Sequence, residues 1–263
     1  MSVRYRPGTP EFLSCQQLER GTLHFSYEGS LKACCRRDFI DMPEISPYGE
    51  TPLDVALITE RIDAIRRSNN GEGEGACHGC AALERKAWPE TNAKYLVNQA
   101  IVLNHFTLCN HKCSYCDIYS NKKPLDITPV LNRLFEQGAV SPHATVIIGG
   151  GEPALLKGQL RAIIEMSRNN GNPIAIATNS SVFSEDIHDF LKTERRPASS
   201  VVTSLDAGTR EDYARKHGRD DFDKVLANLA RYNAVAEKTR VIVKYIVSGA
   251  PHPPVDEASS AAS

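Results

Sequence analysis

Short runs of apolar residues alternate with helix-like patterns along the second half of the chain. The apolar runs cover 96–103, 145–148, 173–177, 200–205 and 240–247. Between them, apolar residues recur at helical spacing in the stretches 128–137, 155–168, 185–192 and 222–236. Strands that alternate with helices over short connections are typical of βα units and a parallel sheet. The pattern from about Tyr95 onward therefore predicts an α/β domain with five strands.

The first 93 residues follow a different pattern. They show little βα alternation, with one helix candidate at 53–67 and a Gly- and Glu-rich loop at 69–75. We expect 1–93 to be an accessory domain and 94–248 to be the core. Residues 249–263 are rich in Pro, Ser and Ala and offer nothing to pack, so they are predicted to be a disordered tail.

Composition narrows the class of protein. The chain has 263 residues, 41% of them apolar, which is enough for one good core. A net charge of -1 gives no electrostatic drive toward nucleic acid or an anionic membrane. No window approaches the ~18 uncharged apolar residues of a membrane span, and the N-terminus lacks the apolar region of a signal peptide. We therefore expect a cytoplasmic protein, in which the eight cysteines are metal ligands or free thiols rather than disulfides.

Three of these cysteines lie close together, directly after the first predicted strand of the core. Cys109, Cys113 and Cys116 fall in the stretch LCNHKCSYCDIY. Three thiolates can hold three irons of a four-iron cluster and leave the fourth open for chemistry, whereas electron-carrying clusters usually take four cysteines. The spacing alone leaves a second interpretation open, a zinc site completed by His105 or His111.

A second motif makes the first one specific. Cys-x3-Cys-x2-Cys, with Tyr115 before the last Cys and Gly-Gly-Glu-Pro at 150–153, resembles the radical S-adenosylmethionine (SAM) superfamily. The resemblance covers about 98–247. It implies a partial (β/α) barrel, here short of its last strand. It also implies a four-iron four-sulfur cluster on the three cysteines, SAM chelated at the open iron, and a reductant protein of the flavodoxin or ferredoxin type.

The same resemblance implies which residues contact SAM. In the family, the Gly-Gly-Glu loop holds the amino group of SAM, and polar residues at later strand ends add contacts. A Ser or Asp at a strand end is also a common helix cap or turn residue, so that alternative stays open. Lys244, in the last predicted strand, is a weaker candidate. The expected SAM-binding residues are Tyr115, Gly150, Gly151, Glu152, Thr178, Asn179, Ser204 and Asp206.

The N-terminal cysteines form a separate candidate site. Cys77-x2-Cys80 is a pair of potential ligands, and Cys34 or its neighbour Cys35, with Cys15, would complete a four-sulfur site. Three interpretations stay open: an auxiliary iron-sulfur cluster, a structural zinc ion, and unligated buried thiols. Auxiliary clusters occur in many radical SAM enzymes that modify peptides, usually after the core rather than before it.

The expected function is reductive cleavage of SAM to a 5′-deoxyadenosyl radical, which takes a hydrogen atom from a substrate. Modification of a peptide or protein is the favoured reaction. The alternative is a non-catalytic iron-sulfur or zinc-binding accessory protein with an incomplete barrel. No residue can be named as a catalytic acid, base or radical relay, because the motifs do not fix the substrate pocket.

Overall fold

The computed structural model describes residues 10–34, 43–48, 54–88, 94–116 and 124–245. The predicted disordered tail at 249–263 and Cys35 lie outside these residues. None of the helices in the described ranges is long and apolar enough to cross a membrane.

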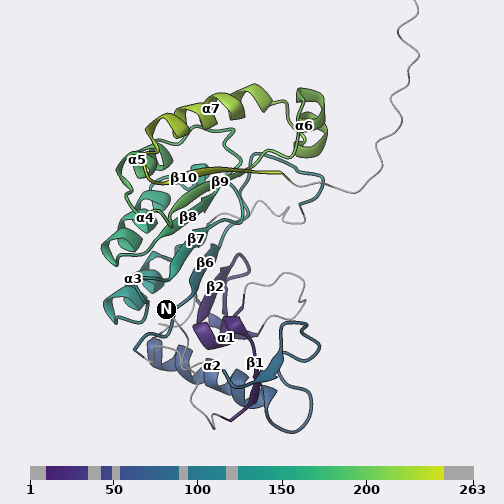
Figure 1. Cartoon of the computed structure of the whole chain (residues 1–263), viewed down its shortest axis with the longest axis vertical. Helices are drawn as coiled ribbons and strands as arrows, with labels where there is room; N and C mark the ends of the chain where they lie inside the picture. Colours follow the sequence, from purple (N-terminus) through teal and green to yellow (C-terminus); the bar gives the residue numbers. More distant parts are fainter. Residues whose placement is uncertain (1–9, 35–42, 49–53, 89–93, 117–123, 246–263) are drawn as a thin grey trace, which may run out of the picture.

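One eight-stranded sheet runs through the described part of the chain, in the order β10-β9-β8-β7-β6-β2-β3-β4 (Figure 1). Its first six strands in that order are parallel neighbours, whereas β3 and β4 pair antiparallel at the other edge. The sheet is open, as in a partial barrel, and the expected α/β class is confirmed. The strands are β2 (Thr22–Ser26), β3 (Ser30–Lys32), β4 (Glu44–Pro47), β6 (Ala100–Asn104), β7 (Thr145–Ile148), β8 (Ile174–Ala177), β9 (Ser200–Ser204) and β10 (Arg240–Lys244).

Helices pack along one side of the parallel strands (Figure 1). They bury the apolar face that their sequence pattern predicts, because Leu131, Ile163 and Ile187 are all fully buried. The strands contribute residues such as Ile101 and Val201 to the core. The helices are α3 (Thr128–Glu136), α4 (Gln159–Asn169), α5 (Glu185–Thr193), α6 (Arg210–His217) and α7 (Phe222–Val235).

The N-terminal residues contribute to the same sheet as the core. β2 pairs in parallel with β6, so the sheet continues without a break into the residues expected to form an accessory domain. Beside it lie α2 and a small antiparallel pair of strands, β1 and β5. The division at residue 93 stays a prediction. The bounds are β1 (Phe12–Ser14), α1 (Gln16–Arg20), α2 (Val55–Asn69) and β5 (Glu84–Lys86).

The core elements match the sequence pattern, except that β6 begins at Ala100 rather than at residue 96 and two larger differences occur in the helices. The predicted helix at 155–168 is wrong at its start, because Pro153–Leu155 form a 3₁₀ turn and Gly158 adopts φ +76° before α4 begins. The sequence pattern also missed α6, in which only Tyr213 and His217 are buried. Two buried residues in eight give no amphipathic signal.

Candidate functional site

The predicted site residues lie in loops that follow successive parallel strands. The cysteine triad follows β6, the Gly-Gly-Glu loop follows β7, and Thr178 and Asn179 follow β8. Asp206 lies two residues beyond β9. Because the carboxyl ends of parallel strands meet at one edge of a sheet, the loops that follow β6, β7, β8 and β9 lie together. These four loops form the mouth of the candidate site.

The glycines of the second motif bring its loop against the base of the cysteine loop. The Gly151 N–H donates to the Phe106 carbonyl over 3.1 Å, and the Glu152 N–H donates to the Leu108 carbonyl over 2.8 Å. A Cβ atom on Gly151 would stand 2.1 Å from the Leu108 oxygen, which no side chain permits. Gly150 has φ +96°, a conformation that favours glycine. These glycines therefore serve the contact between the two loops.

Glu152 is a buried carboxylate held in one orientation. Its Oε1 accepts hydrogen bonds from Thr178 Oγ1 at 2.7 Å and from the Ala154 N–H at 2.9 Å, and its Oε2 accepts one from the Asn179 N–H at 2.6 Å. Burial raises the pKa of its carboxyl group, and these three bonds act in the opposite direction. No Lys, Arg or His of the described residues contributes to that balance. Such a carboxylate is a strong acceptor for the ammonium group of a ligand.

Asn179 connects this carboxylate to the cysteine loop. Its side-chain amide donates to Asn110 Oδ1 over 2.9 Å and lies 3.8 Å from the Cys109 sulfur. Its backbone N–H binds Glu152 at the same time. A ligand that contacts Glu152 would therefore lie beside the first cysteine of the triad.

The three triad cysteines are half-buried and close enough to influence one another. Burial raises the pKa of Cys113 to about 11, and the Cys109 and Cys116 thiols add to this shift. Burial likewise raises the pKa of Cys109. Protein ligation of iron requires thiolates, so a positive ion would favour the form that burial opposes here.

The cysteine loop is also held by α6, the helix that the sequence pattern missed. The Lys112 N–H donates to the His217 carbonyl over 3.1 Å, and the Ser114 N–H donates to the Lys216 carbonyl over 2.7 Å. The Tyr115 hydroxyl donates to Asp206 Oδ2 over 2.6 Å. Tyr115 and Asp206, two predicted SAM contacts, are thus joined to each other.

Two residues in these loops adopt the left-handed backbone conformation without being glycine. Ser180 has φ +57° and Asp206 has φ +56°, and both side chains are fully buried. Such conformations cost about 1–3 kcal/mol and occur preferentially at functional sites. Ser204 is half-buried at the end of β9, and its register partner Lys244 is exposed.

Comparison with known proteins identifies the family. The family model described as the Radical SAM superfamily matches residues 103–251, more than half of the chain. The chain belongs to the radical SAM superfamily. Members of this superfamily are enzymes, and membership implies a four-iron four-sulfur cluster and SAM as cofactors.

Two curated relatives match part of this radical SAM chain. The 7-carboxy-7-deazaguanine synthase of Rhodopirellula baltica is 28% identical over 151 residues, 57% of this chain and 56% of that protein. The GTPase Obg of Brachyspira hyodysenteriae is 25% identical over 146 residues, 51% of this chain and 21% of that protein. The chain thus spans about half of one relative and a fifth of the other, and its sequence contains no Gly-x4-Gly-Lys-Ser/Thr loop.

Solved structures of two radical SAM proteins also resemble the chain. Streptococcus suis SuiB bound to SAM aligns with a TM-score of 0.43 at 19% identity, over 53% of this chain and 32% of that one. The protein anSMEcpe, bound to AdoMet and the Cp18Cys peptide, aligns with a TM-score of 0.44 at 21% identity, over 54% and 42%.

The donor atoms at the mouth fit the cofactors of a radical SAM protein. A single tetrahedral zinc with bonds of about 2.3 Å would draw its ligand sulfurs to about 3.8 Å from one another. The three triad sulfurs do not all lie within 4.8 Å of one another. They are therefore more widely spread than the ligands of one zinc ion. A cluster binds each thiolate to a different iron and needs such a spread. Glu152, which no cation of the described segments accompanies, fits the ammonium group of SAM.

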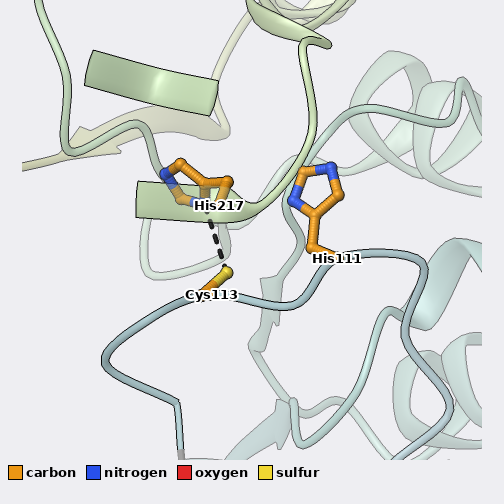
Figure 2. A group of neighbouring side chains, drawn as sticks. All are labelled: His111, Cys113 and His217. Atoms are coloured by element: carbon orange, nitrogen blue, oxygen red, sulfur yellow. Dashed lines mark hydrogen bonds between the residues drawn. The ribbon is translucent and has the colours of Figure 1, made fainter. Parts of the chain in front are cut away.

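One different group of metal-binding atoms does lie close together. Figure 2 shows His111 and Cys113 on the cysteine loop and His217 facing them, with ligand atoms within 4.8 Å of one another. Nδ1 of His217 is 3.2 Å from the Cys113 sulfur, and its Nε2 is 3.1 Å from the Leu205 carbonyl oxygen. Burial lowers the pKa of His111 to about 4 and also lowers that of His217. Neutral imidazoles of this kind can bind a metal.

His105, the other zinc ligand considered from the sequence, does not join this group. Its Nε2 lies 3.3 Å from Gln159 Oε1, and its ring packs edge-on against Phe106. His217, which the group does contain, was not among the residues singled out from the sequence. It lies 104 positions after Cys113, and no motif links the two.

The N-terminal cysteines also come together. Cys34, Cys77 and Cys80, with Cys15, line one cavity of about 20 Å³. Burial raises the pKa of Cys77, the Asn69 amide lowers it, and the Cys15 and Cys80 thiols raise it further. The His78 side chain is 66% exposed and does not line the cavity.

Proposed function

We propose that this chain is a radical SAM enzyme whose mouth binds a four-iron four-sulfur cluster through Cys109, Cys113 and Cys116 and cleaves SAM reductively. The observation that carries the proposal is the Glu152 carboxylate, which is buried with no cation beside it among the described residues and is joined through Asn179 to Cys109. When bound, the reduced cluster supplies the electron that converts SAM to methionine and a 5′-deoxyadenosyl radical.

In this proposal, the residues of the chain bind SAM and hold it in one orientation. Glu152 accepts the ammonium group of SAM, and Thr178 and the Asn179 N–H keep its carboxylate fixed. Gly150 and Gly151 hold that loop against the cysteine loop. Fixed acceptors cost little reorganisation when the ligand binds, which favours a single SAM orientation. Tyr115, Ser204 and Asp206 complete the proposed SAM pocket.

The substrate is proposed to be a peptide or protein, and the electron donor a flavodoxin or ferredoxin. The second cysteine group motivates the substrate class, as it did from the sequence. Incubation with SAM, reductant and a peptide library would test it by mass spectrometry, with small heterocyclic substrates as the comparison. Modification of only the small molecules would refute the peptide proposal.

The first experiment is anaerobic reconstitution with iron and sulfide, reduction, addition of SAM and assay for 5′-deoxyadenosine. We expect the product with the unaltered chain and none with Cys109→Ala or Cys116→Ala. A fully loaded cluster that binds SAM yet yields no product would refute the enzymatic proposal and favour the accessory-protein alternative.

A mononuclear zinc site at His111, Cys113 and His217 is the second candidate, favoured by their ligand atoms within 4.8 Å of one another. Two matched variants separate it from the cluster. A zinc site would lose its metal in the double variant H111A/H217A and keep it in the double variant C109A/C116A. The cluster proposal expects the reverse for iron, measured by elemental analysis in chains that also carry C77A/C80A, so that metal at the N-terminal cysteines does not contribute.

A further inference from the structure

Four cysteines from three separate segments converge on one cavity in the N-terminal part of the chain. Cys15 lies between β1 and α1, Cys34 lies two residues after β3, and Cys77 and Cys80 follow α2. The rest of the cavity lining is apolar and includes Leu18 and Leu83. Four thiols gathered in an apolar environment are the donor set of a metal centre.

The local backbone fixes two of these cysteines in a tight turn. The Cys80 N–H donates to the Cys77 carbonyl over 3.1 Å, and Gly79 between them has φ +75°. The Cys77 N–H donates to Asn69 Oδ1 over 2.9 Å, which fastens the turn to the end of α2. Gly75 is required just before it, since a Cβ there would stand 2.7 Å from Asn69 Cα.

Asn69 is directed at the sulfur of one of these cysteines. Its residue is 7% exposed, and its side-chain amide donates a hydrogen bond that lowers the pKa of the Cys77 thiol. Thiolate and sulfide sulfurs accept such N–H bonds, and hydrogen bonds of this kind are a regular feature of iron-sulfur sites.

The spacing of the sulfurs distinguishes a cluster from a single ion. Four sulfurs around zinc stand about 3.8 Å apart. No three of the four sulfurs lie within 4.8 Å of one another. This spread fits thiolates bound to different irons.

We propose that Cys15, Cys34, Cys77 and Cys80 bind an iron-sulfur cluster. With four thiolates the cluster has no open iron, so this site does not bind SAM. It joins β1, the end of β3 and the segment after α2 into one unit. The proposal is independent of SAM cleavage, because it concerns metal binding at a separate set of residues.

The test uses the full chain with the triple substitution C109A/C113A/C116A, which removes the triad and leaves the N-terminal site intact. After anaerobic reconstitution we expect this variant to retain iron and sulfide, with the visible absorption of an iron-sulfur cluster. Adding C77A/C80A should remove both. Cys35→Ala, next to Cys34 in the sequence, is the matched control and should retain the iron.

Two outcomes would overturn the proposal. One is a triple variant that folds, as judged by circular dichroism, but binds no iron. The other is a triple variant purified with one zinc and no iron, as measured by elemental analysis. The triple variant keeps all four proposed ligands, so misfolding caused by their removal cannot produce either outcome. Failure of SAM cleavage by the unaltered chain would leave the iron content of the triple variant unchanged.

Discussion

The two cysteine groups of this protein differ in their surroundings as well as in their number. The triad is half-buried in a loop that contacts three polar residues from other segments, Asn179, Asp206 and His217. The N-terminal group encloses a small cavity with an otherwise apolar lining. Three ligands in a polar, accessible mouth suit an iron that must exchange ligands. Four ligands around an apolar cavity suit a metal centre that stays closed.

The largest effect expected from this difference is on catalysis. Cys113→Ala should reduce 5′-deoxyadenosine formation to background, because it removes a ligand of the proposed SAM-binding cluster. Iron content should fall only in part, since the N-terminal site keeps its own. Both quantities can be measured on the same reconstituted sample. Complete loss of iron would show that the two sites do not load independently.

Gly151→Ala should damage the mouth selectively. Its Cβ would overlap the Leu108 carbonyl, and relieving that contact is expected to lower the free energy of unfolding by about 3 kcal/mol. Urea denaturation measures the loss. Gly208→Ala is the matched control, because no atom lies within 4 Å of its Cβ and the expected change is within about 0.5 kcal/mol. Equal effects of the two substitutions would contradict the close contact.

Acid should destabilise the base of the mouth. Burial lowers the pKa of His105 to about 4, and its bond to Gln159 opposes that shift. In the unfolded chain His105 therefore binds a proton below about pH 6.5, whereas in the folded chain it binds one only below about pH 4. Stability from this group is full above pH 6.5 and declines by up to about 3 kcal/mol as the pH falls to 4.

Unfolding measured at pH 7 and pH 4 would test this expectation. The substitution His105→Leu should shrink the difference in unfolding free energy between the two pH values, even though it also removes the bond to Gln159. An unchanged difference would show that other groups cause the acid sensitivity. His111, whose pKa is lowered in the same direction, is the next candidate.

The smallest effect expected is on SAM affinity. Glu152→Gln should weaken SAM binding about tenfold, roughly 1.4 kcal/mol, because the neutral amide loses its attraction for the ammonium group. Titration calorimetry on the reconstituted protein would measure the change. Glu165→Gln, on the exposed side of α4, is the matched control and should bind SAM normally. Undiminished affinity in Glu152→Gln would remove Glu152 from the proposed SAM pocket.

The sequence predicted the core well and the N-terminal strands poorly, for a physical reason. The five core strands are apolar runs between amphipathic helices, and the structure confirms all five. β2 was missed although Thr22–Ser26 alternate polar and apolar residues, because it has only five residues and its three polar side chains are buried. The motifs located the triad and Glu152, but His217 carries no sequence signal, since it reaches the site only through the tertiary packing of α6.

The backbone hydrogen bonds between the cysteine loop and α6 have a consequence for the order of assembly in the cell. Cys113 and His217 are 104 residues apart, yet backbone hydrogen bonds join their neighbourhoods. At roughly 5–20 residues per second, the ribosome completes α6 about 5–20 s after the cysteine loop. During that interval the cysteine loop has its thiols but lacks its hydrogen bonds to α6. Iron is therefore expected to enter the mouth only after synthesis has passed residue 217.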